Sequence, residues 1–190
     1  MKKMKKFFEH FLERESLFTN KSLLLSHYVP SEILYREDLI NEIANILAPS
    51  LRVERPSNLF VYGKTGTGKT LSIKYILQSM NQIAKERDIP LKSIYVNCKL
   101  KRVADTEYRL IAQVIKDFGR EVPATGLPTD EVYNIFYKLL DSKEQIILLV
   151  LDEIDQLTKK MGDEMLYNLT RINAELKQSQ ICLIGISNNL

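Results

Sequence analysis

The sequence predicts an α/β fold with a parallel sheet, and three observations lead to that prediction. Short apolar runs alternate along the chain with segments of helical periodicity, which is the element order of parallel sheets. Residues 63–70 match the pattern G-x-x-x-x-G-K-[ST] of a phosphate-binding loop, between an apolar run and a helical segment. Residues 146–151 form an uninterrupted apolar run that ends in two carboxylates, as expected of a strand buried on both faces.

The remaining elements follow from the same patterns in chain order. Two prolines and a glycine between residues 120 and 128 divide the region after the second strand into a helical hairpin. The full expected order is helix 36–47, strand 58–62, helix 69–87, strand 93–97, helices 105–119 and 129–141, strand 146–151, helix 161–177 and strand 181–186.

The loop at residues 63–70 has the residue types that anion binding needs. Its glycines allow a positive φ, so backbone N–H groups can approach phosphate oxygens at the start of the following helix. Lys69 is expected to reach the β- and γ-phosphates, and the Thr70 hydroxyl to hold Mg²⁺. The alternative is a glycine-rich turn that matches by chance. The predicted nucleotide-binding residues of this segment are Gly63, Lys64, Thr65, Gly66, Thr67, Gly68, Lys69, Thr70 and Leu71.

Two carboxylates follow the predicted strand at 146–151. In open α/β sheets, ligands bind at the carboxyl ends of the strands. Asp152 is therefore expected to hold Mg²⁺, and Glu153 to orient the water that attacks the γ-phosphate. The alternative for this pair is an ordinary solvated strand end.

Polar amides follow the strand expected at 181–186. A carboxamide at this edge can bind the attacking water or the γ-phosphate, and Asn188 is favoured over Asn189 as the group that faces the site. Register at a strand end is not fixed by pattern alone, so a loop of turn-forming residues is the alternative.

Composition points to a single soluble intracellular domain, which we expect to be cytoplasmic. The 190 residues are 45% apolar and 27% charged, enough for a sizeable core, and no apolar run approaches the roughly 20 residues of a membrane span. Cys98 and Cys182 are expected to be buried free thiols. The two cysteines and two histidines are too far apart to form a recognisable metal site.

Charge patterning gives a weaker signal than the motifs. The net charge of +3 does not by itself demand nucleic acid. Four lysines in the first six residues can touch phosphate, although a solvated terminus is the preferred interpretation. Phe7, Phe8, Phe11 and Leu12 repeat at helical spacing, which predicts a short amphipathic helix that docks on another surface.

Taken together, the motifs resemble those of the archaeal DNA replication initiators, the origin-recognition and cell-division-control family of AAA+ ATPases. The resemblance implies that residues 26–190 are part of an AAA+ domain, preceded by a basic, amphipathic segment at 1–25. It also implies binding of ATP or ADP with Mg²⁺, and packing of Val29 and Pro30 on the adenine with Arg36 close by. The matching segments are Tyr28-Val29-Pro30, Tyr35-Arg36-Glu37, residues 58–70, Leu151-Asp152-Glu153-Ile154-Asp155 and Gly185-Ile186-Ser187-Asn188.

The hairpin at about 101–129 resembles the initiator-specific insertion of that family, which lies against origin DNA. The resemblance implies double-stranded origin DNA, a replicative helicase or other initiator subunits as partners, and no membrane. Basic side chains near the hairpin would then contact phosphates, or alternatively only solvate the helices. These residues are Lys99, Lys101, Arg102 and Arg120.

Members of that family continue beyond a strand called the sensor 1 strand. In this sequence it corresponds to the strand expected at 181–186, the last one before the end of the 190 residues. Family members add a fifth strand, an arginine that reaches a neighbour's nucleotide, a helical lid and a winged-helix domain, and none of these is expected within the 190 residues. The resemblance therefore predicts an unpaired edge on the strand before the phosphate loop, and weak ATP hydrolysis at most. The alternatives are another P-loop ATPase, such as a helicase loader, chaperone or signalling switch, and a non-enzymatic remnant that acts through protein contacts.

Overall fold

The computed structural model describes residues 2–14, 18, 20–25, 28–100, 106–123 and 126–189. The chain divides into two compact units, residues 1–30 and residues 31–190. The first unit contains α1 (Lys2–Glu13) and a 3₁₀ turn (Lys21–Leu24). The predicted amphipathic helix is confirmed in α1, where Phe7 and Phe11 are exposed.

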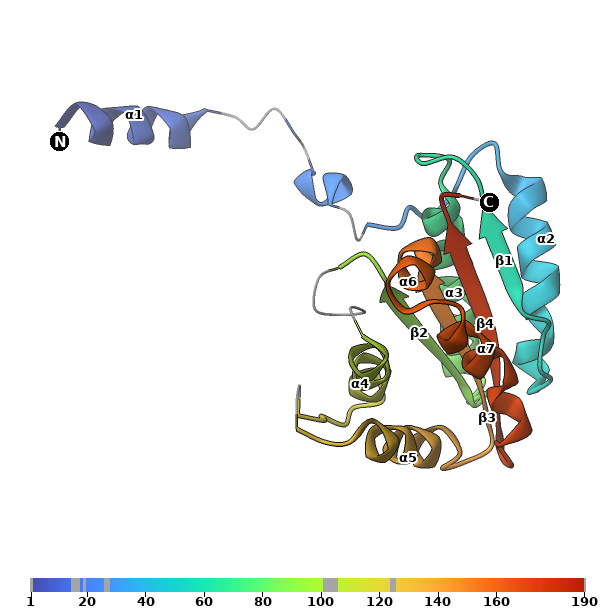
Figure 1. The fold of residues 1–190 in the computed structure, drawn as a ribbon. Coiled ribbons are helices and arrows are strands. Elements are labelled where there is room, and N and C mark those ends of the chain that lie inside the picture. The colour runs from blue at the N-terminus through green and yellow to red at the C-terminus, as the bar shows by residue number, and fades with distance from the viewer. Residues whose placement is uncertain are drawn as a thin grey trace. The chain divides into compact units, whose positions relative to one another are not determined.

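The second unit is built on a four-stranded sheet in the order β1-β4-β3-β2, with all strands parallel (Figure 1). The predicted α/β fold is therefore confirmed. The strands are β1 (Leu59–Tyr62), β2 (Leu91–Asn97), β3 (Gln145–Asp152) and β4 (Ser179–Ser187). The helices are α2 (Glu37–Leu47), α3 (Lys69–Glu86), α4 (Glu107–Asp117), α5 (Thr129–Leu140), α6 (Ile154–Met161) and α7 (Glu164–Arg171), with 3₁₀ turns at Ala48–Arg52 and Ile172–Ala174.

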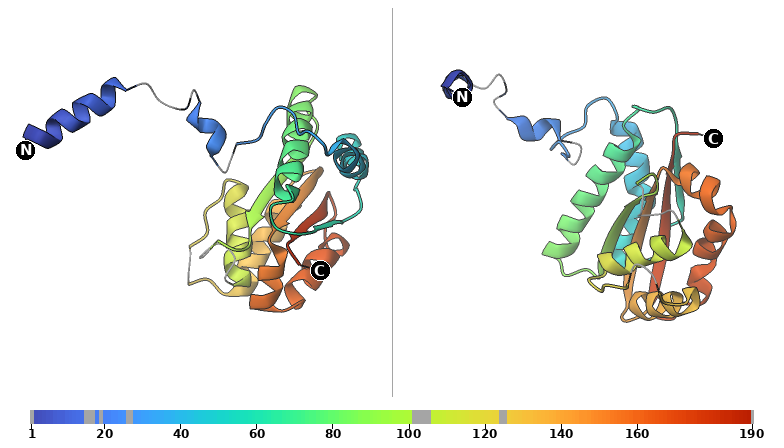
Figure 2. Two further views of the ribbon diagram at one scale, coloured as in Figure 1. Left: turned by 90° about the horizontal axis from the view of Figure 1, so that it is seen from above. Right: turned by 60° about the vertical axis from the view of Figure 1, so that its left-hand side comes forward.

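Helices cover both faces of the sheet, so its central strand β3 is buried along its whole length (Figure 2). Alternate β3 side chains, such as Leu148 and Val150, pack with α2 and α3. The intervening side chains, such as Leu149 and Leu151, pack with α4 to α7 around the fully buried Phe136. Burial on both faces explains why the strand is a continuous apolar run rather than an alternating one.

Both cysteines are free and buried, as predicted. Burial raises the pKa of the Cys98 thiol to about 12 and that of Cys182 to about 11. Both side chains are therefore protonated, unreactive members of the core at neutral pH.

Within the described residues, β1 lies at the edge of the sheet and pairs only with β4. The edge position expected for the strand before the phosphate loop is thus confirmed. Phe60 and Tyr62 lie on the same face of β1, each more than half exposed, with stacked rings 6.0 Å apart.

The helix predicted at 161–177 is wrong in its bounds. The structure has two short helices instead, α6 (Ile154–Met161) and α7 (Glu164–Arg171), followed by a 3₁₀ turn. Gly162 ends α6 with a φ of 77° and a ψ of −166°, a positive-φ conformation that is essentially restricted to glycine. The helical hairpin predicted between the second and third strands is confirmed by α4 and α5, which pack on one another.

Candidate functional site

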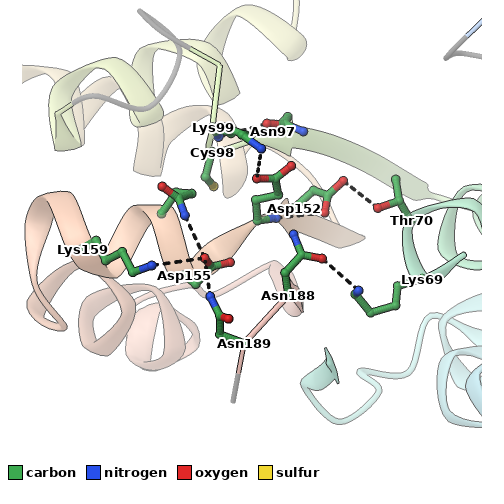
Figure 3. Close-up of polar contacts among 12 residues, drawn as sticks. Lys69, Thr70, Asn97, Cys98, Lys99, Asp152, Asp155, Lys159, Asn188 and Asn189 are labelled. Carbon is green, nitrogen blue, oxygen red and sulfur yellow. Dashed lines mark hydrogen bonds and ion pairs between the residues drawn. The ribbon is translucent and has the colours of Figure 1, made fainter. Parts of the chain in front are cut away.

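The candidate site lies where the carboxyl ends of three strands meet. Strand register places Asn97 of β2 beside Asp152 of β3, and Asp152 beside Ile186 of β4. The phosphate loop follows the edge strand β1 and leads directly into α3. Figure 3 shows that polar side chains from these segments converge at this edge of the sheet.

The backbone of the phosphate loop has the positive φ values that its glycines were predicted to allow. Gly66 and Gly68 have φ values of 81° and 79°, in the left-handed region. A β-carbon on Gly68 would lie 3.3 Å from Nε of Arg36, closer than most real contacts. Arg36, which precedes α2, therefore lies against the start of α3.

Lys69 is held by three hydrogen bonds in the first turn of α3. Its ammonium donates to the backbone oxygens of Gly63 at 2.8 Å and Lys64 at 3.0 Å, and to Oδ1 of Asn188 at 3.0 Å. The Lys69 side chain and backbone together are only 7% exposed. The phosphate loop and the end of β4 are thus joined through one buried cation (Figure 3).

Thr70 and Asp152 bring two oxygen groups together, as Mg²⁺ requires. The Thr70 hydroxyl donates to Oδ2 of Asp152 at 2.9 Å, and the backbone N–H of Glu153 donates to Oδ1 at 2.9 Å. Tyr95 on β2 also donates its hydroxyl to Oδ2 of Asp152. No cluster of three metal-binding side chains exists among the described residues. The Thr70 hydroxyl and the Asp152 carboxylate fit a magnesium ion that takes its other ligands from water and phosphate.

Glu153 follows Asp152 in a left-handed conformation, with φ 54° and ψ 46°, and is the residue immediately before α6. Such a backbone conformation costs a non-glycine residue of the order of 1–3 kcal/mol and is concentrated at functional sites. The Glu153 carboxylate pairs with the Lys99 ammonium at 3.3 Å. Oδ1 of Asn97 accepts the Lys99 N–H at 3.0 Å, which fixes the backbone from which that lysine extends.

The two asparagines after β4 contact different partners. Asn188 contacts Lys69, whereas Nδ2 of Asn189 donates to Oδ2 of Asp155 at 3.3 Å. Asp155 also accepts a hydrogen bond from the Gln156 side chain at 2.9 Å and lies 3.9 Å from the Lys159 ammonium. Burial acts to raise the pKa of Asp155, but hydrogen bonds from the Gln156 side chain and from the backbone N–H groups of Asn188 and Asp155, together with the Lys159 charge, outweigh it, so the pKa lies below its ordinary value.

The other predicted residues have mixed outcomes. Val29 and Pro30 belong to the first unit, so their adenine contact stays a prediction. Lys101 and Arg102 lie outside the described residues, and Arg120 is exposed after α4. Among the other residues predicted to bind the nucleotide, Lys64 and Thr65 are exposed, whereas Thr67 and Leu71 are half-buried.

Tyr95 and Asp155 are members of this cluster that the sequence prediction missed. The strand containing Tyr95 was predicted, but its contact with Asp152 depends on the register between two strands whose paired residues are 55 positions apart in the chain. The sequence indicated Asp155 only as the last residue of the segment 151–155 that carries the family resemblance, with no role of its own. Its partners on α6 and after β4 come together only in the fold.

Comparison with known proteins identifies the fold family. Residues 52–190 match the family described as AAA domain. The chain belongs to the AAA domain family. The predicted resemblance to archaeal replication initiators is also confirmed. No described helix is long and apolar enough to cross a membrane.

Among curated relatives, the chain is 47% identical over 187 residues to the ORC1-type DNA replication protein of Thermococcus onnurineus, a match that covers 96% of this chain and 44% of that protein. It is 46% identical over 192 residues to the ORC1-type DNA replication protein of Pyrococcus furiosus, covering 99% of this chain and 45% of that protein. The chain therefore spans less than half the length of these relatives. The structure of the Aeropyrum pernix ORC1 protein in complex with DNA superposes with a TM-score of 0.81 at 40% identity, over 90% of this chain and 44% of that one.

Proposed function

We propose that this chain is an ATP-binding, Mg²⁺-dependent part of a DNA replication initiator. The observation that supports the proposal most strongly is the linkage of Lys69 to Asn188 and of Thr70 to Asp152 at one edge of the sheet. Membership of the AAA domain family and the similarity to ORC1-type DNA replication proteins support the same function.

Each residue has a distinct role toward the nucleotide. The N–H groups of the loop and the start of α3 bind phosphate oxygens, and the Lys69 ammonium binds the β- and γ-phosphates as a point charge. Thr70 and Asp152 hold the cation. When bound, Mg²⁺ neutralises charge on the β- and γ-phosphates. Arg36, which lies against Gly68, adds a positive charge beside the loop.

Hydrolysis depends on Glu153 and Asn188. Glu153 orients and polarises the attacking water, and Asn188 hydrogen-bonds that water or the γ-phosphate. In the structure the Lys99 ammonium pairs with Oε2 of Glu153, so this carboxylate must leave its partner before it acts as the base. We therefore expect turnover below about 1 s⁻¹, the lower end of ordinary enzymes.

A single-turnover hydrolysis assay tests the role of Glu153. Glu153→Gln keeps the shape of the side chain and removes the base, and it should slow cleavage by about 10²–10⁴-fold without weakening ATP binding. Glu144→Gln is the matched control, because Glu144 is exposed immediately before β3, at the opposite end of that strand. Equal rates for parent and Glu153→Gln would show that Glu153 has another role.

The initiator function includes contact with double-stranded origin DNA and, in the whole protein, with a replicative helicase or other initiator subunits. We assign phosphate contacts to Lys99 and Arg120, and to Lys101 and Arg102 of the same region. The Aeropyrum pernix ORC1 protein, similar over most of this chain, is in complex with DNA in its structure.

Fluorescence anisotropy with a labelled duplex tests this assignment. Lys99→Gln should weaken binding to the same extent for duplexes of different base sequence. It should also reduce, by about 1, the slope of the logarithm of DNA affinity against the logarithm of salt concentration. Lys143→Gln, an exposed lysine before β3, is the control. Absence of DNA affinity in a folded chain that binds ATP would favour another P-loop ATPase. Absence of both affinities would favour an interaction module.

A further inference from the structure

Tyr95 makes the least expected contact in the site. Its hydroxyl donates to Oδ2 of Asp152, the oxygen that also accepts the Thr70 hydroxyl at 2.9 Å. The other oxygen, Oδ1, accepts the backbone N–H of Glu153 at 2.9 Å. Asp152 is only 3% exposed as a residue, and both oxygens of its carboxylate are fixed by donors from three different segments.

The position of Tyr95 explains why only a long side chain can make this bond. Tyr95 lies beside Val150 on β3, and Asn97 lies beside Asp152. Two residues of a strand span about 6.6 Å, so the hydroxyl must reach that far along the sheet edge. Tyr95 packs with the core under α3, and the Lys74 ammonium of α3 lies 4.5 Å from its ring centroid. The ring thus packs against the face of the sheet that α3, the helix that carries Lys69, covers.

We propose that Tyr95 is a positioning residue for the magnesium site: it holds the Asp152 carboxylate in the orientation that faces Thr70. This inference rests on the proposed function, because it assigns Asp152 to Mg²⁺. Without the phenol, the carboxylate keeps fewer donors and can rotate, so part of the binding free energy of the cation is lost in reordering it. Partners that hydrogen-bond to metal ligands typically contribute about 10–100-fold to metal affinity.

The test measures how the ADP affinity of the full chain depends on free Mg²⁺, by calorimetry. Tyr95→Phe keeps the packed ring and removes only the hydroxyl. It should raise the Mg²⁺ concentration at half-maximal effect by about tenfold, while ADP affinity in EDTA stays unchanged. Tyr75→Phe is the control, because Tyr75 lies on α3 and packs against the same core. Should Tyr95→Phe fail to fold, Tyr95→Met supplies a flexible apolar side chain and carries the same expectation.

The outcomes separate this inference from the proposed function. Equal Mg²⁺ dependence in the parent and the hydroxyl-free variant would overturn the positioning role and leave the nucleotide site intact. A parent chain whose ADP affinity ignores Mg²⁺ would also overturn it. A parent chain that binds no nucleotide would overturn the proposed function itself. An equal loss of affinity in EDTA and in Mg²⁺ would show a structural role only, and would contradict the inference.

Discussion

Removal of the Lys69 charge should abolish most of the nucleotide affinity. Lys69→Met keeps an unbranched apolar side chain and deletes the ammonium, which makes hydrogen bonds of 2.8, 3.0 and 3.0 Å to the loop and to Asn188. In the nucleotide complex, we expect the phosphates to take two of these three donors. Asn188 would then lose its charged partner in the variant, and the phosphates would face a methyl group.

The size of the effect follows from those bonds. Hydrogen bonds to charged groups contribute about 1.5–3 kcal/mol each, so two of them amount to about 3–6 kcal/mol. At about 1.4 kcal/mol per factor of ten, this is a loss of roughly 10²–10⁴ in affinity. The lower end is the better expectation, because the parent ammonium must first leave the backbone oxygens of Gly63 and Lys64.

Competition between ATP and a fluorescent ATP analogue measures this loss. Lys64→Met is the matched control, since Lys64 is an exposed lysine of the same loop. It should weaken ATP binding by no more than about fivefold, the equivalent of 1 kcal/mol, as expected for a screened surface charge. If Lys69→Met binds ATP nearly as well as the parent, or if the two variants lose affinity equally, the assignment of Lys69 to the phosphates is incorrect.

Two further predictions concern the framework of the site. Gly185→Ala places a β-carbon 3.1 Å from both Phe60 and Ile154, so the free energy of unfolding in urea should be about 1–3 kcal/mol lower than that of the parent. An unchanged urea midpoint of unfolding would show that these side chains move aside freely. Asp141 accepts backbone N–H groups from residues 177–179, chiefly that of residue 179, which hold the pKa of its carboxyl below the ordinary value of 3.8. A carboxyl whose native pKa is lowered stabilises the fold above pH 3.8, and this stabilisation is lost as the pH falls through the native pKa. Asp141→Asn should therefore lower the Tm at pH 7, and the difference in Tm between the parent and the variant should shrink below pH 3.8. A difference in Tm that is independent of pH would contradict the charge-based explanation.

Local spacing was enough to predict the elements that build the site. The loop at residues 63–70, the buried strand before Asp152 and the strand before Asn188 each have a signal within ten residues. Their convergence then follows from a general property of parallel sheets, whose carboxyl ends share one edge. Cys98 and Cys182 were likewise predictable as buried thiols, because each lies in or next to a strand pattern.

The failures have different physical causes: one helix boundary depends on a single glycine, whereas one contact in the site depends on tertiary packing. Leu166, Leu169 and Ile172 keep helical spacing, which favoured one long helix from 161 to 177. Gly162, which has a positive φ that glycine adopts without steric cost, instead separates α6 from α7. The role of Tyr95 depends on strand register and on the reach of a phenol across two strands, neither of which is encoded locally.

Calorimetric titration of the 190-residue chain with ATP and ADP, in the presence and absence of Mg²⁺, tests the central claim most directly. The geometry of Lys69, Thr70 and Asp152 predicts micromolar or tighter binding, about −8 kcal/mol or better, that strengthens when Mg²⁺ is added. A chain that is folded by circular dichroism yet gives no binding heat with either nucleotide would contradict the proposal that this edge of the sheet is a working nucleotide site.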